Sequence, residues 1–357
     1  MRLFAFRPRY IINGQITTTK VAAVANVKRK NSPASNLGDL DALPLELLHA
    51  IFAMLDFKTL SHIQRTCLRG IAVVESLPQY RDMIEHAPKA LAALGQTQLL
   101  RHHSAAALHA ALLTSECQCC GDYGPFLHLP TARRCCFFCL ENSTQLWVIP
   151  VSQAKSCFNI TNSQLKHLPV MLSIPGAYQV RGSVSRNRKL RLICVGTARE
   201  LVTQEHGDFM SELRAKRTDG RISVKDFYQY RAFRSSPLSS SELKLRPLSS
   251  RENSAIDEYC GMASVPFPHV TASLAVDQGY WCLGCQLTLQ EWYRRTLSHE
   301  DVSHLIPSPC TRRVDDQLRD LTRRARSSAE LLEHLPQCIR GRSLETMEPS
   351  LSCWRKM

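Results

Sequence analysis

The sequence predicts an α+β protein, mainly α, in which a small helical module is followed by a cysteine-stapled α+β region with short strands. Three observations predict this class. One early segment carries apolar residues at helical spacing, cysteines recur in pairs separated by two residues, and the other apolar runs are short. A chain of 357 residues with 44% apolar content is long enough for two or three domains.

The leader, residues 1–38, contains seven basic residues and no acidic one. It supplies about half of the formal net charge of +14. A mitochondrial presequence shares this composition, but Asn13-Gly14 and Ser32-Pro33 would interrupt a long amphipathic helix. We therefore predict a disordered basic leader, with mitochondrial targeting as the lesser alternative.

The helical module is predicted within residues 39–90, with its clearest signal between Asp41 and Gly70. Pro44 suits a first helical position, because its missing N–H would be unpaired there anyway. Asp56 can cap a second helix. A third helix is expected around 78–85. The first helix places its apolar residues on one wide face, namely Leu47, Leu48, Ile51, Phe52 and Leu55.

These residues resemble the F-box family. The LPxELL opening is Leu43 to Leu48, the middle part is Ile51 to Leu55, and Arg65-Thr66-Cys67 stands at the third part. The resemblance implies that the module packs against a Skp-type adaptor, which links it to a cullin. It also implies an adaptor-facing or supporting role for Leu43, Pro44, Leu47, Leu48, Ile51 and Leu55.

A helical spacer, 91–114, leads to a cysteine-rich segment, 115–142. There the pair Cys117/Cys120 is followed after fifteen residues by the pair Cys136/Cys139. Two such pairs can hold one tetrahedral zinc ion. Four thiolates would leave no position for an activated water, so the expected role is structural. Cys119 and Cys135 are alternative ligands, since each lies one residue from a preferred one.

This segment is similar to the one that follows the F-box in a family of filamentous-fungal F-box proteins. The shared pattern is a CxxCG knuckle, a GPFL run and an RxCxxC close, here Cys117–Gly121, Gly124–Leu127 and Arg134–Cys139. The same family implies a helix-turn element at the LPVM and PGAY pieces, Leu168–Met171 and Pro175–Tyr178. It also implies a wCxGC knuckle and an LEHxxxC segment, matching Trp281–Cys285 and Leu332–Cys338.

An α+β region is predicted over 143–234, and a Ser/Pro linker over 235–256. Strands are expected at 146–151 and 189–195, and two short helices between them, capped by Ser152 and by Thr161 or Asn162. Leu165, Leu168 and Met171 are expected in the core. Basic residues outnumber acidic ones between 181 and 234, but no nucleic-acid-binding fold is visible, so nucleic acid is not the expected partner.

A second Cys/His segment is predicted over 257–342, before a tail, 343–357. Thr288-x-x-Glu291 and Ser327-x-x-Glu330 each have the capping-box pattern that opens a helix. Four residues could hold a second zinc ion, with Pro336 ending the helix so that the last of them reaches back. These are Cys282, Cys285, His334 and Cys338, with Cys310 as a spare candidate.

No enzyme chemistry is expected. The sequence contains no phosphate-binding glycine loop, no HExxH helix and no cysteine in a recognisable nucleophile setting. No apolar run approaches the length that crosses a bilayer. The fifteen cysteines, an odd number without a secretory signal peptide, favour reduced thiols and a cytoplasmic or nuclear location.

The resemblance therefore leads us to expect a non-catalytic substrate-recognition subunit of a Skp–cullin–F-box ubiquitin ligase, whose C-terminal part binds an unknown protein substrate. The alternative is a zinc-bound scaffold or nucleic-acid-binding protein that acts independently of a ligase. No repeat array predicts which substrate would bind.

Overall fold

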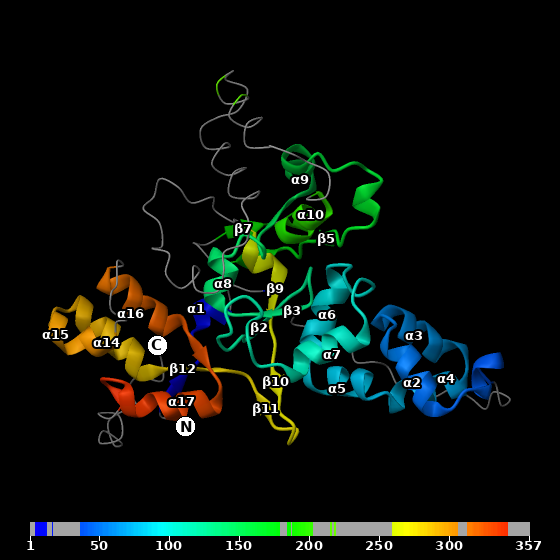
Figure 1. Ribbon diagram of the computed structural model, residues 1–357, viewed down its shortest axis with the longest axis horizontal. Coiled ribbons are helices and arrows are strands. Elements are labelled where there is room, and N and C mark those ends of the chain that lie inside the picture. Colours follow the sequence, from blue (N-terminus) through cyan, green and yellow to red (C-terminus); the bar gives the residue numbers. More distant parts are fainter. Residues whose placement is uncertain are drawn as a thin grey trace.

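The computed structural model describes residues 4–12, 16, 36–178, 184–186, 188–202, 215, 218, 259–305 and 313–341. These residues form a mixed fold of helices and short antiparallel strands, as the sequence predicts. Figure 1 shows helices α2–α4 at one end of the molecule, the sheet containing β2 near the middle, and helices α14–α17 at the other end. Among the described residues, no helix is both long and apolar enough to span a membrane.

Residues 38–113 form a helical array. Asp56 caps α3 as predicted, accepting from the backbone N–H groups of Lys58 and Thr59. Cys67 ends α3 and begins the next helix, because its sulfur accepts from the N–H of Gly70. The elements are η1 Gly38–Ala42, α2 Leu45–Ala53, α3 Phe57–Thr66, α4 Leu68–Ser76, α5 Pro78–His86, α6 Pro88–Gln96 and α7 Ala105–Leu113.

The helix predicted around 78–85 is confirmed, but it is not the third helix of the module. A helix does begin at Pro78, but α4 precedes it, so Pro78 opens the fourth helix of the module. Gly70 permits this arrangement: a Cβ there would lie 2.6 Å from the carbonyl oxygen of Ile63, so α3 and α4 pack in direct backbone contact. Leu48, Phe52 and Leu60 are buried in a core that continues through α5–α7 into the strands beyond.

Strands distant in the sequence form the centre of the molecule. In the sheet β3-β2-β9, Phe126 is paired with Cys135 on one side and with Pro266 on the other. The predicted C-terminal segment is therefore built into the same sheet as the first cysteine segment. Its members are β2 Phe126–His128, β3 Arg133–Cys135 and β9 Ser264–Pro266, and β9 follows the short helix η3 Cys260–Ala263.

The prediction that residues 1–38 form a disordered leader is wrong for the part of this segment that the structure describes. Ala5–Phe6 forms β1, in which Ala5 pairs with Cys282 and Phe6 with Trp281. Ile11 and Ile16 are fully or almost fully buried, because they pack into the two largest cores. The sheet order is β1-β12-β13. The remaining elements of this part are α1 Arg9–Ile12, β10 His269–Val270, β11 Val276–Asp277, β12 Tyr280–Cys282, α14 Leu283–Tyr293, α15 His299–Val302, η4 Ser303–Leu305, α16 Val314–Arg323, β13 Ala325–Arg326, α17 Ser328–His334 and η5 Leu335–Gln337.

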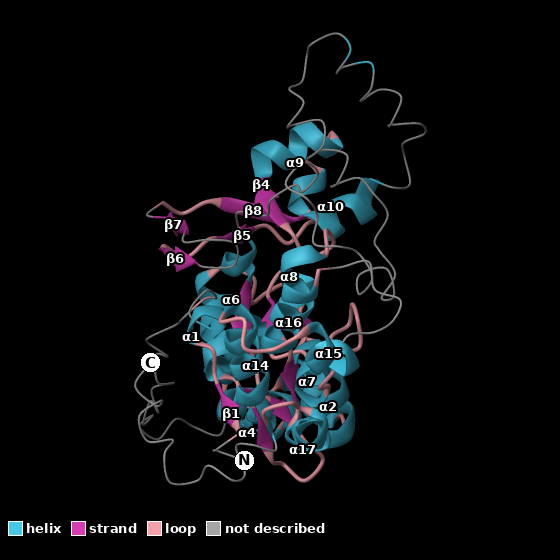
Figure 2. Ribbon diagram, turned by 90° about the vertical axis from the view of Figure 1, so that its left-hand side faces the viewer, coloured by secondary structure: helices cyan, strands magenta, loops and turns pink. Residues whose placement is uncertain are grey.

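A third unit, with the sheet β4-β8-β5 beside α9 and α10, lies at one end of the molecule in Figure 2. The predicted strands at 146–151 and 189–195 are confirmed over shorter ranges. Leu165, Leu168 and Met171 are buried as predicted. The elements are α8 Phe137–Asn142, β4 Val148–Pro150, α9 Val151–Phe158, η2 Gln164–Lys166, β5 Met171–Leu172, β6 Gly176–Tyr178, β7 Val184–Arg186, β8 Arg191–Cys194 and α10 Val195–Val202.

Three local predictions in this unit are wrong. Ser152 lies inside α9 rather than capping it, because the helix begins directly after Pro150. Only a short 3₁₀ turn follows Thr161, although the Thr161 hydroxyl does accept from the N–H of Gln164. The implied helix-turn element is instead β5 and β6. The linker 235–256, the tail 343–357, Cys310 and the basic residues Arg214, Lys216 and Arg217 lie outside the described residues.

Candidate metal centres

The structure brings Cys117, Cys120, Cys136 and Cys139 together. All four side chains are buried, and their sulfur atoms lie within 4.8 Å of one another. The sulfurs of Cys120 and Cys136 are 3.6 Å apart. Four thiolates around one point are the donor set of a closed tetrahedral site for a soft metal ion. We refer to these four residues as centre 1.

Local backbone geometry builds centre 1 from two knuckles. In the first, Gly121 adopts a positive φ of 76° and donates its N–H to the carbonyl of Cys117 at 2.8 Å. In the second, Cys136 caps α8, and its sulfur accepts from the N–H of Cys139 at 3.4 Å. The N–H of Gln118 donates to the carbonyl of Arg134 at 3.0 Å, so the first knuckle is fastened to the strand that leads into the second.

The structure separates the four residues from their alternatives. Cys135 lies on β3, where its sulfur donates to the carbonyl of Phe126, and it is not part of the cluster. Burial raises its pKa well above the ordinary value. Cys119 is partly exposed and is not one of the four residues whose ligand atoms meet, although its thiol contacts that of Cys117. Hydrogen bonds from the thiols of Cys119 and Cys120 lower the pKa of Cys117, so one thiolate in the cluster is already favoured.

Centre 2 consists of Cys282, Cys285, His334 and Cys338, whose ligand atoms also lie within 4.8 Å of one another. The sulfur of Cys285 is 3.1 Å from Nε2 of His334, and the sulfurs of Cys282 and Cys338 are 3.7 Å apart. Hydrogen bonds from the thiols of Cys285 and Cys338 lower the pKa of Cys282. Three sulfurs and one imidazole nitrogen are a donor set that suits a tetrahedral metal site.

Helix ends position the ligands of centre 2. Cys282 ends β12, and Cys285 lies in the first turn of α14. His334 is the last residue of α17, which opens with the predicted Ser327/Glu330 capping box. Cys338 follows η5 in extended conformation, so it reaches back after Pro336 as predicted. A Cβ on Gly284 would lie 2.6 Å from the Cys338 sulfur, so this close approach requires glycine.

The capping box predicted at Thr288 is wrong. α14 already begins at Leu283, and the Thr288 hydroxyl donates instead to the carbonyl of Gly284, four residues earlier in the same helix. α14 begins before Thr288 because Cys282 and Cys285 must lie on one turn for their sulfurs to face the same point. The Cys282–Cys285 knuckle is therefore the first turn of α14.

Sequence reasoning missed Arg134, a fully buried cation beside centre 1. It donates hydrogen bonds to the carbonyls of Ala111, Gly124, Phe267 and Pro268, and its guanidinium lies 5.0 Å from the ring centre of Phe267. Burial lowers its pKa to about 10. The RxCxxC pattern contains this arginine, but only the fold shows that it fastens α7, the first knuckle and the segment after β9 to one another.

The two centres share a strand. In β12, successive side chains point to opposite faces. Trp281 packs in the hydrophobic cluster that surrounds centre 1, whereas the next residue, Cys282, is a member of centre 2. Asp277 adds a second link, because its backbone carbonyl accepts from the Tyr123 hydroxyl and its carboxylate accepts from the N–H of Ser328 at the start of α17.

Comparisons of the chain with protein-family models, with curated proteins and with solved structures gave no match.

Proposed function

We propose that this protein is a non-catalytic substrate-recognition subunit of a Skp–cullin–F-box ubiquitin ligase. Helices α2–α4 would hold the adaptor, and the rest of the chain would present a surface to a protein substrate. Ubiquitin transfer would take place on other subunits.

One observation carries the proposal: α2 has an apolar face that the rest of the described chain does not cover. Leu47, Ile51 and Met54 are 51%, 44% and 71% exposed. They are spaced four and three residues apart, so they follow one side of α2 and its C-cap, Met54. A row of exposed apolar side chains on a folded helix is typical of a protein-binding surface. We refer to these three residues as the α2 stripe.

Neighbouring elements extend the apolar surface. Leu40 on η1 and Leu68 at the start of α4 are also exposed. An ion pair of 3.2 Å between Arg69 and Asp41 joins the start of α4 to the end of η1. Figure 1 shows that α2 and α4 lie at the end of the molecule remote from α14 and α16.

The six residues implied by the F-box resemblance divide into two groups. Pro44, Leu47 and Ile51 are exposed, and they are available to an adaptor. Leu48 is fully buried and can only support the surface from below, while Leu43 and Leu55 are half-buried and pack against the same core. A substitution at Leu48 would therefore unfold the module rather than test the interface.

We propose zinc as the metal of both centres. Sets of four thiolate and imidazole donors suit this ion, and a filled donor set leaves no position for substrate or water. Zinc would tie the knuckles to the central strands, which have few residues each, and so hold the substrate-binding half in one shape.

A pull-down with a Skp-type adaptor tests the function. We expect the wild-type chain to retain the adaptor and the double variant Leu47→Asp/Ile51→Asp to lose it, because two charges would be buried without partners. The matched control is Leu274→Asp/Val276→Asp, which changes two exposed apolar residues on the β10–β11 hairpin.

Equal adaptor binding by the two double variants, or none by the wild type, would overturn the proposal. If the wild type instead binds nucleic acid in a salt-sensitive manner, the alternative of a nucleic-acid-binding scaffold would replace it.

A further inference from the structure

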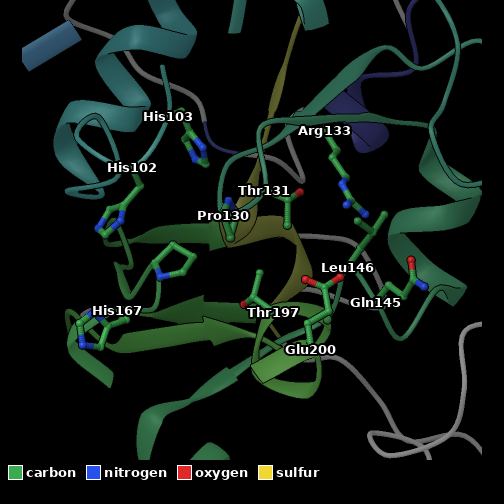
Figure 3. Close-up of a pocket in the computed structure, with 12 residues that line it drawn as sticks. His102, His103, Pro130, Thr131, Arg133, Gln145, Leu146, His167, Thr197 and Glu200 are labelled. Carbon is green, nitrogen blue, oxygen red and sulfur yellow. The ribbon is translucent and has the colours of Figure 1, made fainter. Parts of the chain in front are cut away.

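A cavity of about 290 Å³ lies among the loop before α7, the β2–β3 turn and the beginning of α10, as Figure 3 shows. It belongs to neither metal centre. Its lining includes Arg133, Glu200 and three histidines, so groups of opposite charge line the same space. Such a mixed lining selects no single class of ligand. The N-terminal segment has contacts that point more clearly to one role.

Residues 4–12 lie against the strand that supplies Cys282 to centre 2. β1 pairs with β12, with Ala5 opposite Cys282 itself. The carbonyl of Phe4 accepts from the N–H of Leu283 at 2.9 Å, so the backbone contact continues into the first residue of α14. We refer to residues 4–12 as the strap. The strap therefore borders the backbone of the first ligand of centre 2.

The side chains of the strap divide between the two centres. Phe4 and Ala5 are half-buried and pack against the cluster that contains the three cysteines of centre 2. Phe6 and Ile11 pack in the cluster around centre 1, where Ile11 is fully buried. None of these four residues belongs to either donor set. The strap thus covers both centres without binding metal, and its first two residues are the ones that cover centre 2.

The first part of the strap can detach while the rest of the molecule stays folded. β1 contains two residues and lies at the edge of the sheet β1-β12-β13. Short edge strands open at a low cost in free energy, because they have few hydrogen bonds and little buried surface. Trp281 and Cys282 on β12 are only 1% and 0% exposed. Detachment of β1 would uncover one edge of β12 at Cys282, while β13 still covers the other edge.

We propose that residues 4–6 are a gate for metal exchange at centre 2. A buried donor set keeps its ion from competing ligands, because the surrounding apolar shell controls access to the site. When residues 4–6 detach, a chelator or a foreign thiolate reaches the ion and removes it. The freed thiolates take up protons, and no electron is transferred. Centre 1 stays closed, since Ile11 remains in its core. The gate rests on the metal proposed for centre 2 and is independent of the ligase role.

Alkylation of cysteines after zinc removal tests the gate. The zinc-loaded full chain is mixed with excess EDTA and N-ethylmaleimide, and mass spectrometry follows Cys282 and Cys120, one ligand of each centre. We expect Phe4→Asp to speed the alkylation of Cys282 about tenfold and to leave Cys120 unchanged, because a buried charge favours the detached strand. Leu274→Asp is the matched control, since it places the same charge at a 67% exposed residue of the β10–β11 hairpin and should change neither rate.

A second variant covers the case in which Phe4→Asp does not fold. Phe4→Ala removes the packing of the ring without adding a charge, so it should speed the alkylation of Cys282 by a smaller factor, about threefold. Thermal melting monitored by circular dichroism shows whether each variant is folded before EDTA is added.

Equal alkylation rates of Cys282 in the wild type and the folded Phe4 variant would overturn the gate. So would equal acceleration at both centres, which would indicate general destabilisation. A wild-type chain without zinc at centre 2 would overturn the metal proposal and the gate together. All variants should retain the adaptor in the pull-down, because the strap contains no residue of the α2 stripe. Loss of adaptor binding by the wild type would therefore concern the ligase proposal alone.

Discussion

Glu141 and Arg323 form a largely buried ion pair, with 3.1 Å between Oε2 and Nη1. Glu141 lies on α8, the helix that carries Cys139, and Arg323 ends α16. The backbone carbonyl of Arg323 also accepts from the indole N–H of Trp281 at 3.0 Å. The pair therefore connects the surroundings of centre 1 with the strand that supplies Cys282 to centre 2.

Arg323→Met should destabilise the fold by about 3 kcal/mol, because it leaves the Glu141 carboxylate buried without this partner. Arg319→Met is the control, since its ion pairs with Asp315 and Asp316 are more exposed and should contribute about 0–1 kcal/mol. Urea unfolding monitored by circular dichroism measures both. Equal losses in the two variants would contradict a linking role for Glu141 and Arg323.

Metal analysis should find two zinc ions in each purified chain, one for each cluster. Cys120→Ser and Cys285→Ser should each lose one ion, because a serine hydroxyl is a poor ligand for zinc beside thiolates. Cys119→Ser should keep both, since Cys119 lies outside the cluster. A loss of metal from Cys119→Ser would show that the first site uses a different set of sulfurs.

Removing both ions with a chelator should unfold the central part of the chain, because structural zinc contributes on the order of 10 kcal/mol to such sites. The expected signs are a lower melting temperature and faster proteolysis of the segments around Cys117 and Cys338, with α2–α4 more resistant. A melting temperature that is unchanged after complete metal removal would exclude a structural role.

Arg134→Met should cost at least about 3 kcal/mol, because it leaves four carbonyls without their shared donor and three of these contacts are fully buried. Arg133→Met, at the exposed neighbouring position, should change the stability by less than about 0.5 kcal/mol. Denaturant unfolding of the two variants measures the difference. Similar denaturant midpoints for the two variants would contradict this prediction and would mean that water hydrogen-bonds the four carbonyls in place of the guanidinium.

His128 should make the fold sensitive to acid. Complete burial lowers its pKa to about 3, so the folded chain resists protonation that the unfolded chain accepts below about pH 6.5. The contribution of neutral His128 to the free energy of unfolding is therefore fully present above pH 6.5. It falls by about 1.4 kcal/mol per pH unit as the pH decreases toward 3. His128→Gln should reduce this slope between pH 6.5 and 5. Metal loss at low pH would affect the wild type and the variant equally, so the difference between them isolates His128. Equal pH dependence of the free energy of unfolding in the two proteins would contradict the prediction.

Short-range features were predictable from the sequence. Asp56 caps α3, Ser327 and Glu330 form a capping box, and the three CxxC pairs form knuckles, because each depends on atoms within about four residues. The mainly α composition follows from the same local signals. Thr288 shows where these local signals fail. Its sequence pattern is typical of a helix start, but α14 already begins in the turn that joins Cys282 to Cys285.

The tertiary structure decided which segments meet. Spacing favoured Cys120 over Cys119, and the structure brings Cys120 into the cluster, but spacing could not show that Leu48 faces the core while Leu47 faces solvent. Nor could it predict that Ala5–Phe6 pairs with β12 or that β9 joins β2. Two-residue and three-residue strands carry little information of their own. Their partners are selected by the surfaces that they bury together, across more than a hundred residues of chain.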